Sequence, residues 1–223
     1  MSMMAAYARE NYLKAIVKAL AVPERKRIGT GELAGILGVT SGTVTVMLKK
    51  LEREGYLKYE PHQGCALTDE GACYGLRVLR RHRILETFLV DTLDLDWADV
   101  HEEAELLEHA ASERLIDIID SYLGYPARDP HGDPIPGKRQ QKYTLQDTPL
   151  ASFAEGATAR IVRIDGDKNT FAYYRREGLI PGANVCIVRK EVASGLVTLS
   201  IRAMESTFAL SVLENVFAET NEQ

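Results

Sequence analysis

The sequence predicts an α+β protein composed of a winged helix-turn-helix, a helical middle region and a small β-barrel. Helical apolar spacing broken by a glycine turn and followed by a hairpin pattern indicates the first part. Helical spacing continues to about residue 123, and short β-like runs begin at residue 148. A chain of 223 residues is long enough for one to three domains with buried cores.

The first two helices are predicted over residues 7–21 and 32–37. Thr30 is expected to be the N-cap of the second helix, because a hydroxyl can accept a hydrogen bond from a free backbone N–H. Gly38 marks a turn after this helix.

A third helix and a wing follow this turn. Thr40 or Ser41 is the expected N-cap, and Gly55 ends the helix. Two helices joined by a short glycine-containing turn form a helix-turn-helix. The pattern of residues 56–67 then predicts a small β-hairpin.

The rest of the chain changes from helices to strands. A long helix with several arginines is predicted over 68–91. Apolar residues recur at helical spacing over 97–112 and 113–123, whereas the Pro and Gly residues of 124–146 predict a linker. The β-like runs are 159–164, 184–189, 196–201 and 207–210, with a short helix over 170–177. The domain boundaries are expected at 1–73, 74–137, a linker over 138–147, and 148–223.

Cysteine content and hydropathy exclude several protein classes. Cys65, Cys73 and Cys186 form no C-x-x-C pair, so we expect no disulfide framework and a reducing cytoplasm as the location. No run approaches the roughly 18 apolar residues of a membrane span. We expect no signal peptide and no membrane partner.

Charge is unevenly distributed along the chain. Residues 1–81 contain 13 Lys+Arg and 8 Asp+Glu, whereas residues 82–126 contain 2 and 12. A basic region followed by an acidic one suggests that the first binds a polyanion and the second binds cations. The alternative for the acidic region is a solvated helix surface.

The third predicted helix is expected to enter the major groove of DNA with its N-terminal residues at base edges. Its small side chains favour contacts to thymine methyls and water-bridged readout over bidentate contacts. Basic residues would bind phosphates. The alternative is an ordinary helical hairpin within a core. The expected base-facing residues are Ser41, Gly42, Thr43, Thr45 and Val46, and the expected phosphate contacts are Lys49, Lys50, Arg53, Lys58 and His62.

Histidine and glutamate residues lie at helical spacing in the middle region. Four of them fall at i, i+4, i+7 and i+8 in the helix predicted over 97–112, and two more fall at i, i+4 in the preceding helix. Imidazole nitrogen with carboxylate oxygen suits divalent first-row ions. A divalent-metal site is therefore predicted, with an exposed charged face as the alternative. The residues are His101, Glu105, Glu108 and His109, with His82 and Glu86.

A metal-dependent hydrolase with an accessory helix-turn-helix is the competing interpretation. The motif H-E-x-x-H of many zinc enzymes is absent, because His101-Glu102 is followed by Glu105 at the position that would need His. We also find no Ser-His-Asp order, P-loop or dinucleotide fingerprint. We therefore expect the metal to act as a signal rather than a catalyst. A third interpretation is a winged-helix regulator that senses an organic ligand.

The order and spacing of these motifs resemble the diphtheria-toxin-repressor family of metal-dependent transcriptional regulators. The resemblance covers nearly the full length and includes the winged motif, RHRILE at 81–86, VHEEAELLEH at 100–109 and GDPIPG at 132–137. It implies a winged helix-turn-helix, a helical metal-binding and dimerisation domain, and a C-terminal domain similar to an SH3 barrel. It also implies a homodimer that represses metal-transport genes by binding a palindromic double-stranded DNA operator when metal is present.

The resemblance also implies two metal sites. His82, Glu86 and His101 match one family site. Glu105, Glu108 and His109 match the other. Iron-responsive members typically carry Cys at the position of Glu105, and manganese-responsive members carry Glu. Mn(II) is therefore the expected activator, with Fe(II) as the runner-up.

Two departures from the family pattern concern these sites. The second site usually takes Met or Asp from the first helix, and the matching residue here is Asn11, with Glu10 as a nearby alternative. The family's barrel lends ligands to the first site. The corresponding place lies near Asp167 and Thr170, of which Asp167 is the better candidate.

Overall fold

The structure is a computed structural model that describes residues 3–220, and it divides into two compact units. The first unit contains the chain up to Leu85, together with Glu105–Ile119 and Ile135–Gln146. The second unit contains Glu86–Ala104, Asp120–Pro134 and the chain from Asp147 onward.

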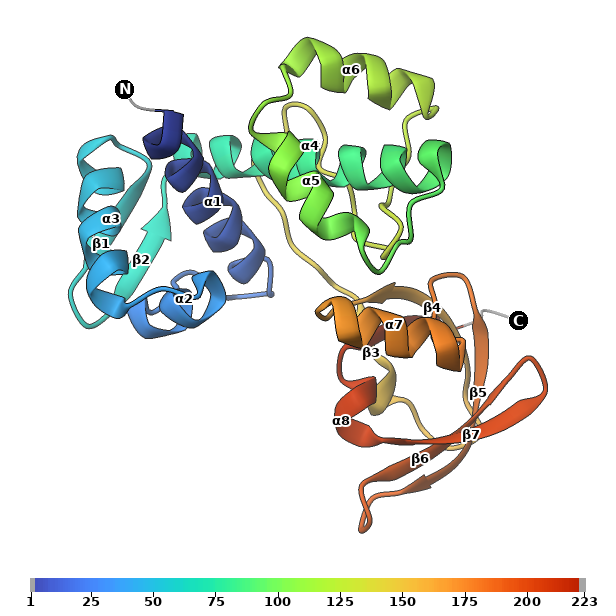
Figure 1. The fold of residues 1–223 in the computed structure, drawn as a ribbon. Helices are drawn as coiled ribbons and strands as arrows, with labels where there is room; N and C mark the ends of the chain where they lie inside the picture. Colours follow the sequence, from blue (N-terminus) through green and yellow to red (C-terminus); the bar gives the residue numbers. More distant parts are fainter. Residues whose placement is uncertain (1–2, 221–223) are drawn as a thin grey trace. The chain divides into compact units, whose positions relative to one another are not determined.

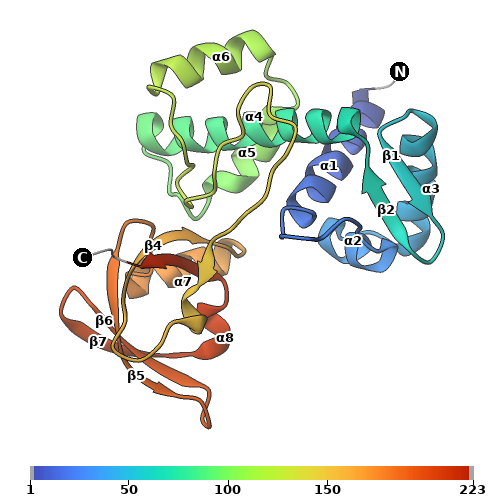
Figure 2. The same cartoon turned by 180° about the vertical axis from the view of Figure 1, so that it is seen from behind.

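The first unit begins with the predicted helix-turn-helix. Helix α1 spans Met3–Ala19, α2 spans Thr30–Leu37 and α3 spans Ser41–Arg53, and the three lie together with the wing in both views (Figure 1, Figure 2). Their apolar faces meet in one core. That core includes Leu13, Ile16, Leu33, Leu48 and Leu51.

The caps of α2 and α3 differ in kind. Thr40 is the N-cap of α3, and its side chain accepts a hydrogen bond from Thr43 N, as predicted. The prediction for α2 is wrong, because Gly29 is its N-cap and Thr30 is already the first helical residue. Gly38 ends α2 in the left-handed conformation, with φ of 63°.

The wing is the antiparallel hairpin of β1 (Leu57–Glu60) and β2 (Gly64–Leu67). Ile28 adds one isolated bridge to Cys65, which joins the wing to the loop before α2. Gly64 permits this approach, since a Cβ there would lie 2.0 Å from Ile28 O. The predicted hairpin is confirmed.

Three further helices follow, α4 (Asp69–Leu93), α5 (Val100–Glu108) and α6 (Glu113–Tyr122), and most of the metal-binding candidates lie on the first two. The helix predicted over 97–112 is wrong at both ends. It begins late because Asp96 accepts hydrogen bonds from Ala98 N and Val100 N in a turn. It ends at Glu108, so His109 lies just beyond the helix.

Helix α1 packs unusually closely on α4. A Cβ on Gly75 would lie 2.7 Å from Leu13 O and 2.6 Å from Val17 Cγ2. Only glycine permits this separation without movement of the α1 backbone. The polar residues of α1 are thereby held beside those of α4.

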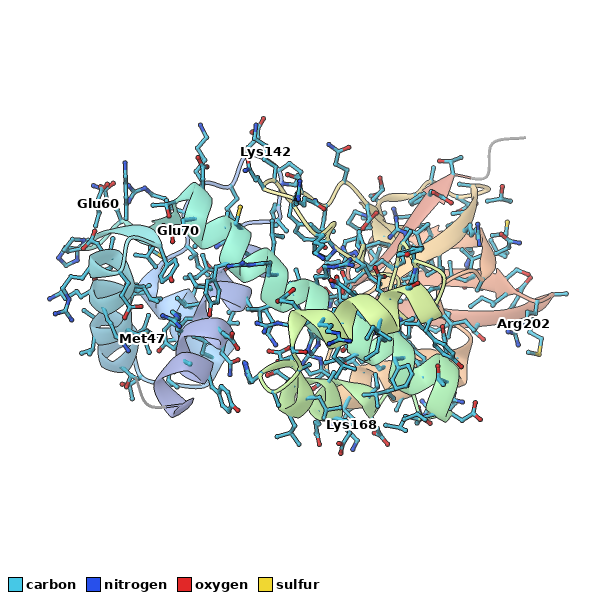
Figure 3. The ribbon with its side chains drawn as sticks, turned by 90° about the horizontal axis from the view of Figure 1, so that it is seen from above. Met47, Glu60, Glu70, Lys142, Lys168 and Arg202 are labelled. Atoms are coloured by element: carbon cyan, nitrogen blue, oxygen red, sulfur yellow. The ribbon has the colours of Figure 1, made fainter. Side chains whose placement is uncertain are left out.

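The second unit contains an antiparallel six-stranded sheet with the order β3-β8-β4-β5-β6-β7. The apolar side chains of this sheet form one core, to which Phe171 and Tyr174 of helix α7 (Lys168–Glu177) also contribute. Arg202 lies at the tip of the β6–β7 hairpin (Figure 3). The strands are β3 (Thr148–Pro149), β4 (Thr158–Ile164), β5 (Asn184–Glu191), β6 (Leu196–Ile201), β7 (Met204–Ala209) and β8 (Val216–Thr220), with helices η1 (Leu150–Ser152), α7 (Lys168–Glu177) and α8 (Leu210–Leu213).

Most predicted strands of this unit are confirmed, with three differences. The strand predicted over 207–210 begins earlier, at Met204, and ends at Ala209. Strands β3 and β8 are not anticipated by the sequence pattern.

Among the residues described, no single helix is long and apolar enough to cross a membrane, although α2 and α3 together reach that length and hydropathy with a 106° bend between them.

Candidate metal centre

Four charged or imidazole side chains meet inside the first unit, and we call them the Lys14 cluster: Lys14 of α1, His82 of α4, and Glu105 and Glu108 of α5. Lys14 Nζ lies 2.5 Å from Glu105 Oε1, and 2.7 and 2.9 Å from the two oxygens of Glu108. His82 Nδ1 lies 2.7 Å from Glu108 Oε2. The Glu108 side chain is fully buried, which contradicts an exposed charged face at this position.

A second group in the first unit joins α1 and α4 to His109, which directly follows α5. His109 Nδ1 lies 2.6 Å from Glu10 Oε2, and the His109 ring stacks on Tyr7 at 4.6 Å. Arg81 donates to Glu10 Oε1 at 2.9 Å. Burial would raise the pKa of Glu10, but the hydrogen bond from His109 and the charge of Arg81 outweigh it and lower that pKa. Glu10 is therefore ionised at neutral pH.

Asn11 has a free acceptor in the interior. Its Oδ1 is buried and has no hydrogen-bond partner, whereas buried polar atoms are ordinarily satisfied. An amide oxygen is a ligand that hard divalent cations accept. This orphaned oxygen lies on α1, the helix that also carries Glu10 and Lys14, and its chemistry suits the donor set of a divalent-metal site.

The second unit contains another group, which we call the His131 cluster: Glu86, His101, Asp129 and His131. One ligand atom each of Glu86, Asp129 and His131 lies within 4.8 Å of the other two, and all three residues are buried. His101 Nδ1 lies 3.1 Å from Glu86 Oε1. Two buried carboxylates beside imidazoles also form a donor set that fits a divalent cation.

The position of His131 is determined by several contacts. Its Nε2 lies 2.7 Å from Trp97 O, and its ring stacks on Phe171 with centroids 4.2 Å apart. A carbonyl can only accept, so Nε2 carries the proton of the neutral ring and Nδ1 keeps its lone pair. Burial lowers the pKa of His131 despite the charge of Glu86, which favours this neutral form.

Asp129 and His131 belong to a tight loop within the segment predicted as a linker. Asp129 Oδ1 accepts from the backbone N of His131 and of Asp133, both at 2.9 Å. Gly132 has φ of 87°, and a Cβ there would lie 2.0 Å from Val162 O. The available signal was the polar pair Asp129 and His131 within the Pro- and Gly-containing run before Ile135, a composition that by itself indicates an unstructured segment.

Asp167, the barrel residue predicted as a ligand, has another partner in the structure. It is the N-cap of α7, and its Oδ1 accepts from Thr170 N at 2.8 Å and from Thr170 Oγ1 at 2.7 Å. Both bonds account for the carboxylate as a helix cap. Its role as a ligand stays a prediction.

The predicted DNA-reading face lies on the exposed side of α3. Ser41, Gly42, Thr43 and Val46 are exposed, and the side chain of Thr45 donates to Ser41 O at 2.9 Å. The basic residues on the same side of the helix and in the wing are also exposed or half-buried. These are Lys49, Lys50, Arg53, Lys58 and His62.

Comparison with known proteins accounts for almost all of the chain. Residues 5–65 match the family model of the iron dependent repressor N-terminal DNA binding domain, and residues 68–137 match that of its metal binding and dimerisation domain. Residues 148–219 match the FeoA domain.

Individual relatives agree with these models. An uncharacterised HTH-type transcriptional regulator of Methanocaldococcus jannaschii is 39% identical over 115 residues, which cover 51% of this chain and 90% of the relative. The diphtheria toxin repressor of Corynebacterium glutamicum is 30% identical over 185 residues, which cover 76% of this chain and 77% of the relative.

Solved structures give the same result over nearly the full length. A manganese-dependent transcriptional repressor in complex with manganese superposes with a TM-score of 0.87 and 33% identity, covering 95% of this chain and 99% of that one. This similarity extends over the winged motif, the helices that follow it and the C-terminal sheet. The chain belongs to the iron-dependent repressor family, the diphtheria-toxin-repressor family of iron- or manganese-dependent transcriptional repressors.

Proposed function

We propose that this protein is a homodimeric repressor of metal-ion homeostasis genes that binds its DNA operator when loaded with Mn(II). The observation that carries the proposal is the pair of carboxylate–imidazole clusters, with Glu86 and Glu108 buried in them, in a chain that also presents an exposed DNA-reading face. Family membership supports metal dependence and DNA binding.

The residues that would hold metal come from both clusters. The family match supports a first set of ligands that contains His82, Glu86 and His101. We add Asp129 and His131 to this set because their ligand atoms lie close to that of Glu86. The second set would be Glu105, Glu108 and His109, completed by Asn11 or Glu10. A bound divalent cation would offset the negative charge of these buried carboxylates.

Ligand chemistry supports Mn(II) over Fe(II). The proposed ligands are carboxylate and amide oxygens and imidazole nitrogens, and none of the three cysteines belongs to either cluster among the residues described. Hard oxygen ligands suit Mn(II), whereas a thiolate would favour softer ions. The solved relative that contains manganese agrees with this choice.

Exposed apolar residues support a dimer. Leu106 of α5 is 73% exposed, and Ile118 of α6 is 56% exposed. Leu115 lies three residues before Ile118 on the same face of α6. Binding to a palindromic operator would require this dimer to hold its two α3 helices on successive major-groove turns, about 34 Å apart. Metal would then stabilise the DNA-competent arrangement.

DNA binding as a function of metal tests the proposal. A duplex selected from a random pool with Mn(II) is titrated by fluorescence anisotropy with Mn(II), with Fe(II) and with chelator. We expect Mn(II) to raise affinity at least tenfold. Equal affinity in all three conditions would contradict metal activation, and a larger response to Fe(II) would contradict the choice of metal.

A pair of variants on one helix locates the effect. Glu108→Gln removes a buried carboxylate and should abolish the Mn(II) response. Glu103→Gln removes an exposed carboxylate from the same helix and should leave it unchanged. An unchanged response in Glu108→Gln would show that the second set of ligands is misplaced.

In the proposed function the metal takes part in no chemical reaction, and the protein acts as a regulator and not as an enzyme. The domain boundaries and the cytoplasmic location stay as predicted from the sequence. Turnover of a phosphoester or peptide panel that depends on Mn(II) would favour the hydrolase instead.

A further inference from the structure

Lys14 brings a positive charge to residues that are themselves proposed to bind a cation. It lies on α1, is 6% exposed, and points its ammonium at the carboxylates of α5. A charged lysine is almost never this deeply buried unless it is paired. Its partners are Glu105 and Glu108, two of the residues proposed to bind metal.

The ammonium is fully satisfied by these partners. It has three N–H donors, and three carboxylate oxygens lie within 2.9 Å: Glu105 Oε1 and both oxygens of Glu108. Charge-assisted bonds of this kind are the strong class of hydrogen bonds. Glu105 and Glu108 are therefore already paired with a cation that the chain itself supplies.

A divalent cation at the same oxygens competes with the ammonium. Two positive charges at hydrogen-bond distance of one carboxylate repel each other strongly in the interior. Movement of Lys14 away from these oxygens would therefore favour metal binding. Its flexible four-carbon stem makes that movement possible without displacement of α1.

The orphaned oxygen of Asn11 argues against a permanent replacement of metal by Lys14. Asn11 precedes Lys14 by three residues, so both project from the same face of α1. Lys14 makes its three bonds to α5, yet Asn11 Oδ1 stays buried without a partner. The face of α1 that carries Lys14 thus also presents a buried oxygen that the ammonium does not use.

We propose that Lys14 is a built-in competitor for the Glu105–Glu108 carboxylates and that it sets the Mn(II) concentration at which this site loads. The inference rests on the proposed function of these residues as metal ligands. In the absence of Mn(II), Lys14 ties α1 to α5. When the Mn(II) concentration rises, Mn(II) displaces the ammonium. The site therefore loads at a higher Mn(II) concentration than its ligands alone would require.

Calorimetric titration with Mn(II) alone tests this role. Lys14→Leu removes the ammonium and should lower the half-saturating Mn(II) concentration of one class of sites about tenfold or more, because the carboxylates lose their internal cation. The other class should not change. Lys14→Arg keeps a positive charge and should bind Mn(II) as weakly as the unaltered protein. Lys18→Leu, which removes an exposed lysine from the same helix, is the matched control.

Two results would overturn the role of Lys14. One is an unchanged Mn(II) affinity in Lys14→Leu, and the other is the loss of a binding class, which would make Lys14 a positioning residue for the ligands. If the unaltered protein binds Mn(II) and Lys14→Leu does not differ from it, the inference fails and the proposed function stands. If the unaltered protein and all variants bind no Mn(II), the proposed function itself fails.

Thermal melting followed by circular dichroism covers the case in which Lys14→Leu is unstable. Removal of the Lys14 ammonium from Glu105 and Glu108 should lower the melting temperature of Lys14→Leu measured without Mn(II). Saturating Mn(II) should then raise the melting temperature of Lys14→Leu by more than it raises the melting temperature of the unaltered protein. A variant that stays unfolded in saturating Mn(II), while Lys14→Arg folds, would refute displacement by metal.

Discussion

Replacing Gly132 with alanine should destabilise the second unit and remove Mn(II) binding at the His131 cluster. Gly132 has φ of 87°, which costs an alanine about 1 kcal/mol. The new Cβ would also lie 2.0 Å from Val162 O and 2.8 Å from Arg163 Cα, both of which are backbone atoms of β4. Such overpacking costs about 1–3 kcal/mol, so the total is about 2–4 kcal/mol.

The effect should reach the cluster because His131 directly precedes this glycine. His131 O accepts from Ile164 N at 3.0 Å, and Gly132 N donates to Asp129 O at 3.0 Å. Moving Gly132 away from β4 must therefore shift the residues that carry the proposed ligands. Such a shift would separate the ligand atoms of Asp129 and His131 from that of Glu86, which lie within 4.8 Å of one another in the structure.

Gly124→Ala provides a matched control for the cost of placing an alanine in the left-handed backbone conformation. Gly124 belongs to the same unit and has φ of 75°, but nothing lies within 4 Å of the point that an alanine Cβ would occupy there. Urea unfolding should show a loss of about 1 kcal/mol for Gly124→Ala and at least twice that for Gly132→Ala. Equal losses, together with unchanged Mn(II) binding by calorimetry, would refute the close approach of Gly132 to β4.

Three further predictions concern other parts of the molecule. Lys49→Ala should weaken DNA binding for all sequences alike and reduce the slope of log affinity against log salt by about 0.9, measured by anisotropy at several salt concentrations; a change in sequence preference would contradict a phosphate contact. The bond from Ala98 N and the charge of Arg175 lower the pKa of Asp96, so its stabilising effect is present above the ordinary pKa of 3.8 and is lost as pH falls through the lower native value. Asp96→Asn should therefore weaken the acid dependence of stability below pH 3.8, and an unchanged acid unfolding curve would contradict it. Burial raises the pKa of Cys65 to about 11, so its thiol should resist alkylation at pH 8 until the protein unfolds, as measured by peptide mass spectrometry; rapid labelling of the folded protein would disprove this.

The helices and the wing could be predicted from the sequence because their signals are local. Apolar spacing reports which face of a helix is buried, and Thr40 and Gly38 mark the start of α3 and the end of α2. Errors occurred where a neighbouring residue provided the cap, as at Gly29, or where a turn interrupted a helical pattern, as at Asp96. Strands β3 and β8 were missed because short segments carry too little periodicity.

The sequence by itself determined the family, the DNA-reading helix and the residue types of the proposed metal ligands, because these depend on spacing within single segments. Tertiary structure alone decided which charges meet. Lys14 lies 91 residues from Glu105 along the chain, and no pattern within α1 distinguishes it from an exposed lysine. Likewise, Asp129 and His131 join Glu86 because backbone bonds hold a Pro- and Gly-containing loop in one shape. Periodicity shows that a side chain is buried, whereas only packing determines the partner against which its charge is balanced.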